Sequence, residues 1–223
     1  FSRSIAAELL PTTRCAFMPN SLRRDVVDIW RVDLESIAPC EYSLAEQECA
    51  RKFRREIDRQ RFLASRTALR RILASYLQVA PREIVFSYNA CGKPFVENSE
   101  WQFNLSHCRT VALIAMTRNI VVGVDIEKVS EARARRMKNL LSPEDVGEGF
   151  STREICERWV RLEALIKARG EGLSVPLPPM RVLESGYSAQ ALVFSDDFVG
   201  ALAIAGENAG EIRWRDYASG LSL

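Results

Sequence analysis

The sequence predicts an α+β fold made of two halves of similar architecture, each combining helices with a small antiparallel sheet. Two observations carry this prediction. Helical patterns that open with capping boxes begin at Ser43 and at Ser151. Short apolar runs separated by turn residues, typical of antiparallel strands, accompany each helical region. The two halves share an order of elements but no repeat of residue identity, and we place them at residues 1–119 and 120–223.

The first half begins with residues 1–23, which we expect to be extended because they show little periodicity. Alternation of apolar and polar residues predicts a strand at 25–34. A helical region follows from Ser43 to about residue 78, with a break near Asp58 and an end marked by Pro81. Further on, the sequence predicts a strand–turn–strand unit at 83–96 and strands at 102–107 and 111–117.

The second half is predicted to begin with a strand at 120–127, reached through a turn at 117–119. The pattern is helical from 132 to 141, and Ser142 followed by Pro143 predicts a new helix start. A longer helix is expected from Ser151 to Gly170. The remaining predictions are a proline-containing loop at 175–179, a hairpin at 191–206 and a strand at 211–218.

Composition excludes several classes of protein. Lys and Arg total 31 against 29 acidic residues, a balance that does not demand a nucleic-acid partner. Six scattered cysteines without a CxxC pair fit neither a zinc site nor a disulfide framework. No apolar run reaches the ~18 residues of a membrane span. The chain opens at Phe1 without a signal-peptide pattern, so we expect residues to precede it and a cytoplasmic location.

Two acidic residues, Asp125 and Glu127, stand two positions apart on the predicted strand 120–127. Residues i and i+2 of a strand share a face, so both carboxylates point the same way while Val124 and Ile126 pack behind them. Such carboxylates repel each other unless a cation lies between them, and Mg²⁺ prefers oxygen ligands. Taken alone, the pair is equally typical of a solvated strand end.

A second group lies on the helix after Ser151, where Trp159, Glu163 and Lys167 are spaced four apart and share one face. The helix could present a third carboxylate and a lysine to the strand. The ordinary alternative is an i,i+4 surface pair of ~0.3 kcal/mol.

Polar and basic residues of the first half form further candidates. Ser106 and His107, the single histidine, end an apolar strand where both could hold a phosphate. Lys93 and Pro94 lie in a constrained turn. The helix at 51–66 is strongly basic, which is typical of a solvated face but also suits polyanions, because guanidinium groups match phosphate oxygens.

These motifs, in this order and spacing, resemble the larger, Sfp-type phosphopantetheinyl transferases. The matching motifs are GKPF, FNLSH, GVDIE and WxxxEAxxK followed by GEGLSVPL, together with the upstream helix RRExDRQRFLxxR. The resemblance covers about residues 46–178, and the GVDIE strand combined with the WxxxEAxxK helix is its most specific part.

The resemblance implies a two-lobed, pseudo-symmetric fold with coenzyme A bound in a cleft between the halves. It implies a Mg²⁺ ion shared with the coenzyme A pyrophosphate and held by Asp125, Glu127 and Glu163. It implies that coenzyme A is contacted by Lys93, Pro94, Ser106, His107, Arg54, Arg61 and Arg66, the arginines near the 3′-phosphate or adenine. Lys167 would steady the pyrophosphate and help the leaving group depart. Two halves in one chain would make a monomer sufficient.

The chain departs from the family at Leu162, where relatives usually carry lysine. A leucine cannot bind phosphate, so we expect it to pack, and Arg161 or Arg158 would take over any role of the missing charge.

The implied reaction moves phosphopantetheine from coenzyme A to a serine of an apo acyl or peptidyl carrier protein and releases 3′,5′-ADP. We assign Glu163 as the base for that serine, directly or through a metal-bound water. Two alternatives remain open: a metal-dependent nuclease, which would need a basic groove across the acidic face, and a non-catalytic coenzyme A binding module.

Overall fold

The computed structural model of the chain describes residues 26–173, 176–207 and 210–217. The predicted extended segment 1–23 lies outside the described residues, as do Val175 of the predicted loop and Ala218 of the last predicted strand.

The first half contains the elements β1 (Val26–Asp33), η2 (Leu34–Ser36), α1 (Leu44–Arg51), α2 (Glu56–Leu77), η3 (Pro81–Glu83), β2 (Ser87–Tyr88), β3 (Pro94–Phe95), β4 (Trp101–Cys108) and β5 (Val111–Arg118). The second half contains β6 (Val122–Lys128), α3 (Glu131–Lys138), α4 (Thr152–Arg169), α5 (Met180–Leu183), β7 (Tyr187–Leu192), β8 (Phe198–Ala205) and β9 (Glu211–Asp216). The α+β class predicted from the sequence is confirmed.

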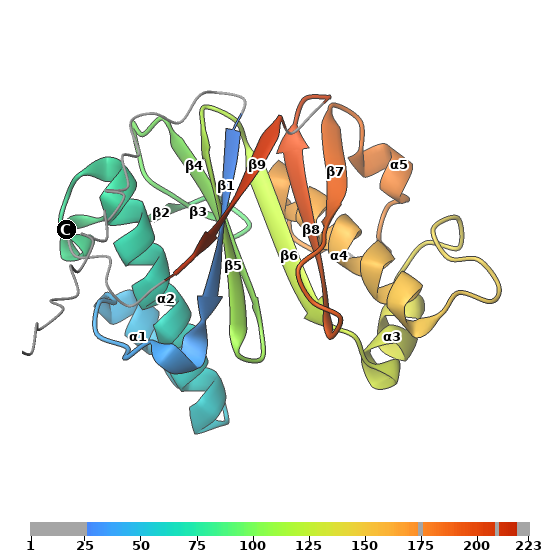
Figure 1. Ribbon diagram of the computed structural model, residues 1–223, viewed down its shortest axis with the longest axis horizontal. Coiled ribbons are helices and arrows are strands. Elements are labelled where there is room, and N and C mark those ends of the chain that lie inside the picture. The colour runs from blue at the N-terminus through green and yellow to red at the C-terminus, as the bar shows by residue number, and fades with distance from the viewer. Residues whose placement is uncertain (1–25, 174–175, 208–209, 218–223) are drawn as a thin grey trace, which may run out of the picture.

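Two sheets form the centre of the molecule, as Figure 1 shows. The first has the strand order β4-β5-β1-β9 and the second β6-β8-β7, while β2 and β3 form a separate ribbon. Helix α2 covers the outer face of the first sheet, and α3, α4 and α5 cover that of the second. The inner faces pack on each other through residues such as Ile29, Leu113, Val124 and Leu202. The layers therefore run helix, sheet, sheet, helix.

The break in the first helical region lies earlier than predicted. Helix α1 ends at Arg51 and α2 starts at Glu56, so Asp58 belongs to the first turn of α2. Acidic side chains are favourable there because the N-terminus of a helix carries a partial positive charge. The predicted capping boxes at Ser43 and Ser151 are both confirmed.

The prediction that a helix starts at Ser142 is wrong. Residues 143–145 form a turn, closed by a hydrogen bond from the Asp145 amide to the Ser142 carbonyl. The Asp145 carboxylate instead accepts a hydrogen bond of 3.0 Å from the Met180 amide, where the short helix α5 begins. Asp145 therefore anchors the start of α5 rather than belonging to a helix that begins at Ser142.

The last predicted strand exists as β9 but joins the first sheet, where it pairs parallel to β1. A buried carboxylate holds it there. Asp28 of β1 accepts hydrogen bonds from Nε of Arg213 at 3.1 Å, from Nε of Arg215 at 3.3 Å and from the hydroxyl of Tyr76 at 2.7 Å. A strand from residues assigned to the second half thus completes the first sheet.

Candidate functional site

Three of the predicted site residues, Ser106, Asp125 and Glu127, lie along the seam between β4 and β6, the strands at which the two sheets meet. Three alternate side chains of β4 reach across this seam. Asn104 Oδ1 accepts a hydrogen bond from the Val124 amide at 2.9 Å. Ser106 Oγ donates to Asp125 Oδ1 at 2.7 Å, and Cys108 Sγ donates to Glu127 Oε2 at 3.2 Å. Both carboxylates of β6 are therefore held by side chains of the first half.

Asp125 is the centre of the site and is only 5% exposed. As predicted, Val124 and Ile126 enter the core, here the one between the sheets. Lys167 of α4 places its Nζ 2.6 Å from Asp125 Oδ1 and 3.0 Å from Ser106 Oγ. Strand β4, strand β6 and helix α4 thus each supply one group to a single hydrogen-bonded cluster.

Glu163 stands one helical turn before Lys167, with its Oε2 3.9 Å from that residue's Nζ. Burial and, next, the negative charge of Asp125 raise the pKa of Glu163 to about 7, against the opposing effect of Lys167. A carboxyl with a pKa near neutrality can accept a proton from a substrate and release it again. The role of Glu163 as the base stays a prediction, with which this raised pKa is compatible.

Glu127 has different partners from the other two acids. Its carboxylate pairs with the guanidinium of Arg133 on α3 and accepts the hydrogen bond from Cys108. In the described part of the chain, no three His, Cys, Asp or Glu side chains are placed to share a metal ion. The three predicted ligands therefore lie on neighbouring elements without forming a ready-made ligand set.

The donor chemistry nevertheless suits a hard divalent cation. Asp125 and Glu163 offer carboxylate oxygens, and the charge of Asp125 disfavours ionisation of Glu163. A cation between them would relieve that repulsion, and Mg²⁺ prefers such oxygen donors. Lys167 supplies the positive charge beside these acids.

Ser106 and His107, both predicted to contact phosphates of coenzyme A, lie on opposite faces of β4. Adjacent residues of a strand point to opposite faces. His107 therefore lies toward α2, while Ser106 lies toward β6. Burial, reinforced by the nearby charges of Arg66, Lys167 and Arg61 and opposed by Asp58, lowers the pKa of His107 to about 4. The imidazole is neutral, between the basic helix and the Lys167 cluster.

Two arginines of α2, Arg61 and Arg66, make contacts that use only part of each guanidinium group. Arg61 pairs with Glu35 at 3.2 Å, and the Arg66 guanidinium lies 5.0 Å from the centre of the Phe62 ring. Among the described residues, the Nε groups of Arg61 and Arg66 are buried without a hydrogen-bond partner. Arg54 is exposed in the link before α2. Arg61 and Arg66 therefore retain unused donors near His107.

Lys93, predicted to contact coenzyme A, reaches from the first half into the second. Its Nζ donates to the carbonyls of Val122 at 3.0 Å and Ala168 at 3.1 Å, both in the second half. Burial lowers its pKa to about 8. Pro94 follows in β3. These contacts occupy the ammonium group with backbone oxygens rather than leaving it toward the Asp125 cluster.

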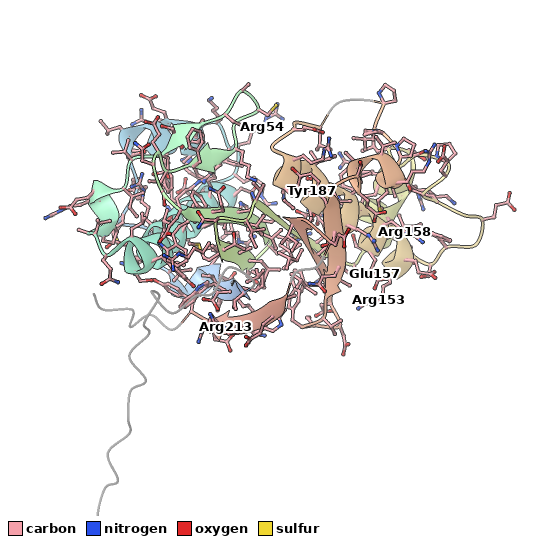
Figure 2. The ribbon with its side chains drawn as sticks, turned by 90° about the horizontal axis from the view of Figure 1, so that it is seen from above. Arg54, Arg153, Glu157, Arg158, Tyr187 and Arg213 are labelled. Carbon is pink, nitrogen blue, oxygen red and sulfur yellow. The ribbon has the colours of Figure 1, made fainter. Side chains whose placement is uncertain are left out.

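Leu162 packs as predicted, because it is 0% exposed within the core beneath the second sheet. The two suggested substitutes for the family's lysine differ in their contacts. Arg161 binds Glu184 through two contacts, at 2.6 and 3.0 Å, and Arg158 lies over the Phe150 ring at 5.7 Å. Figure 2 shows Arg158 on the second half, away from Arg54 on the first.

Sequence reasoning missed Asn104, Cys108 and Arg133. The first two stand two residues before and after Ser106, so strand alternation alone would have placed them on the same face. Arg133 follows the acidic strand on a helix with several basic residues, and no local pattern marks it as the partner of Glu127.

Two family models together match most of the chain. One, described as "4′-phosphopantetheinyl transferase, N-terminal", matches residues 30–119, and the other, the "4′-phosphopantetheinyl transferase superfamily", matches residues 121–219. The boundary between the matches falls between β5 and β6, at the junction of the two sheets.

Curated proteins of the same kind are similar over long stretches. The 4′-phosphopantetheinyl transferase HetI of Nostoc sp. is 30% identical over 217 residues, covering 84% of this chain and 92% of the relative. A phosphopantetheinyl transferase of Thraustochytrium sp. is 30% identical, over 68% of this chain and 63% of the relative. The transferase Sfp of Bacillus subtilis is 26% identical, over 61% and 64%.

The fold and the matches define the class of protein: a transferase built of two α+β halves. The chain belongs to the 4′-phosphopantetheinyl transferase superfamily, whose members carry phosphopantetheine to carrier proteins. In the part of the chain that the structure describes, no helix has the length and apolarity needed to cross a membrane.

Proposed function

We propose that the chain transfers 4′-phosphopantetheine from coenzyme A to a serine of an apo acyl or peptidyl carrier protein, with Mg²⁺, and releases 3′,5′-ADP. The observation that carries this proposal is the cluster of Asp125, Glu163, Lys167 and Ser106, built from both halves. It combines two carboxylates, an ammonium group and a hydroxyl within hydrogen-bonding or ion-pairing reach.

The reaction replaces a phosphoanhydride bond at the β-phosphorus of coenzyme A with a phosphoester bond to serine. The carrier serine Oγ attacks the β-phosphorus of coenzyme A, and the bond from that phosphorus to the bridging oxygen breaks. The hydroxyl proton passes to Glu163, whose raised pKa suits the acceptor role. The bridging oxygen leaves with 3′,5′-ADP.

Lys167 is the group that opposes the developing negative charge. Its ammonium is held by Asp125 and Ser106 before a ligand arrives, so it is already oriented. A pre-positioned cation in a partly buried site stabilises charge on a leaving oxygen without reorganisation. Positioning and charge neutralisation are the main requirements of phosphoryl transfer.

The residues that would hold Mg²⁺ are Asp125 and Glu163. Glu127 would be a third carboxylate ligand if the metal ion replaced its contact with Arg133. The ion would supply neutralisation of the diphosphate charge. On the other face of β4, His107, Arg61 and Arg66 would bind phosphate groups through their free donors. A cytoplasmic, monomeric enzyme remains our prediction.

The test is intact-mass spectrometry after incubation with Mg²⁺, coenzyme A and a broad panel of apo carrier proteins. We expect a phosphopantetheinyl adduct on at least one carrier and an equal amount of 3′,5′-ADP. Glu163→Gln removes charge and basicity while keeping shape, so transfer should collapse. Glu157→Gln is the matched control, because Glu157 is an exposed acid of the same helix, paired with Arg153.

Other outcomes favour the alternatives. Cleavage of nucleic acid that depends on Mg²⁺, with no carrier modified, would establish the nuclease. Binding of coenzyme A without either activity would establish a non-catalytic module.

A further inference from the structure

The turn at residues 89–93 contacts the second half through two side chains. Asn89 first shapes the turn: its Oδ1 accepts hydrogen bonds from the amides of Cys91 at 3.0 Å and Lys93 at 2.8 Å. Gly92 completes the bend with a φ of +83°, which glycine adopts without strain. The turn is therefore a rigid base from which the side chains of Asn89 and Lys93 extend.

Both side chains reach the last turn of α4. Asn89 Nδ2 donates to the Gly170 carbonyl at 2.8 Å, and Lys93 Nζ donates to the Ala168 carbonyl at 3.1 Å. The last carbonyls of a helix lack partners within the helix, and a cation there is favourable. The turn thus supplies an external cap to the helix that carries Glu163 and Lys167.

Lys93 also fixes the strand beside that helix. The same Nζ donates to the Val122 carbonyl of β6 at 3.0 Å, three residues before Asp125. One ammonium group of the first half therefore joins the strand that carries Asp125 to the helix that carries Lys167. The first half also carries Ser106, whose hydroxyl must meet both groups.

We propose that Asn89 and Lys93 form a clamp between the halves, the inter-half clamp, which sets the position of α4 relative to Ser106 and Asp125. They are positioning residues for the transfer reaction, and Lys93 is not a phosphate contact. The inference deepens the proposed function and rests on it for its kinetic consequences.

The chain offers closely matched variants. Lys93→Met keeps the length of the stem but removes the donors, and Lys93→Arg restores donors. Asn89→Asp keeps the Oδ1 that shapes the turn and removes the Nδ2 that reaches Gly170. Lys138→Met, at an exposed lysine ending α3, controls for the loss of a positive charge.

We expect Lys93→Met and Asn89→Asp each to lower kcat at saturating carrier protein by about tenfold, because a misplacement of 1 Å can cost up to ~100-fold. The KM for coenzyme A should stay within about twofold, since no phosphate contact is lost. The preference for coenzyme A over 3′-dephospho-coenzyme A should not change. Lys93→Arg should recover part of kcat, and the double variant should lose less than the product of the single losses.

If Lys93 contacted a phosphate of coenzyme A, its replacement would change KM rather than kcat. If Lys93→Met raises the KM for coenzyme A about tenfold or removes the preference over the dephospho form, with kcat unchanged, the clamp is refuted. Additive losses in the double variant would refute joint action of the two residues.

Hydrogen exchange separates the clamp from the proposed function. The amides at residues 166–171 should exchange faster in Asn89→Asp and Lys93→Met than in wild type and in Lys138→Met. This readout needs no activity, so it holds even if no carrier is modified. Unchanged exchange in both clamp variants would overturn the inference, and the Asn89→Asp result decides it if Lys93→Met does not fold.

Discussion

Replacing Gly123 by alanine should disable the site without touching any of its functional groups. Gly123 is the second residue of the acidic strand β6 and is buried under α4. A Cβ at this position would lie 2.1 Å from the Ala164 carbonyl oxygen and 2.4 Å from the Ala168 nitrogen. Both atoms are helix backbone and cannot rotate away. The glycine of the GVDIE motif is therefore needed for the close approach of α4 to β6.

The size of the effect follows from these distances. A carbon and a carbonyl oxygen in contact normally stay about 3.3 Å apart, so α4 must move by about 1 Å. Overpacking of this kind costs about 1–3 kcal/mol or more. Glu163 and Lys167 each precede a clashing residue, and a shift of that size can lower kcat by ~100-fold. The KM for coenzyme A should change less, since His107 and the α2 arginines lie on the first half.

The assay combines thermal unfolding with steady-state transfer kinetics. Gly172→Ala is the control, because a Cβ there meets only Cys91 Sγ, at an ordinary 3.7 Å. Gly200→Ala, with its nearest neighbour at 3.0 Å on a side chain, should be intermediate in stability. If Gly123→Ala retains the wild-type melting temperature and kcat, the close packing of α4 on β6 is not what aligns the site.

Three further predictions concern protonation, packing and the last strand. The pKa of His107 is about 4 in the free protein, below its usual 6.5, and phosphate charge should raise it; coenzyme A binding at pH 5.5 should therefore take up a proton. Calorimetry in buffers of different ionisation enthalpy should detect the uptake in wild type but not in His107→Gln, and its absence from wild type would contradict the placement of phosphate there. Leu162→Lys should lower the free energy of unfolding by about 3 kcal/mol or more, because it buries a charge at a fully enclosed position. The folded fraction should bind coenzyme A with an affinity within about tenfold of wild type. Denaturant unfolding measures the stability and a binding titration the affinity, and a large gain in affinity would show that the missing lysine is a deficit. Asp28→Asn should cost about 2–3 kcal/mol, because two arginines of β9 lose their buried carboxylate; unchanged denaturant stability would mean that Asp28 does not hold β9.

Local patterns predicted much of the fold. Strand alternation found β1, β4, β5 and β6, and the capping box at Ser151 with Gly170 located α4 at both ends. These features depend on residues close together in the chain, so the sequence displays them directly. The burial of Val124 and Ile126 behind the acidic residues followed from the same alternation.

Pairings between distant segments could not be predicted in this way. Alternation identified β9 as a strand but not its partner, because the choice depends on Asp28, more than 180 residues away. Similarly, the constrained turn before Lys93 was visible, but the carbonyls that receive its ammonium belong to β6 and α4. The opposite faces of Ser106 and His107 were predictable, since adjacent strand residues always diverge.

Strand β4 divides the site by charge, and this division suits the ligand in the proposed function. Its β6-facing side meets the carboxylates Asp125 and Glu127, which on their own would repel a diphosphate. Its α2-facing side carries His107 beside Arg61 and Arg66, whose buried Nε donors are unused among the described residues. A polyanion would gain its first attractive contacts on the α2 side, and its reacting phosphorus would then lie near the acids only where Lys167 and a divalent cation offset their charge. Because both faces belong to one strand, the β4 backbone sets the distance between the groups that bind phosphate and the groups that react. The position of α4 relative to β4 is not set in this way, and the inter-half clamp and Gly123 would control it.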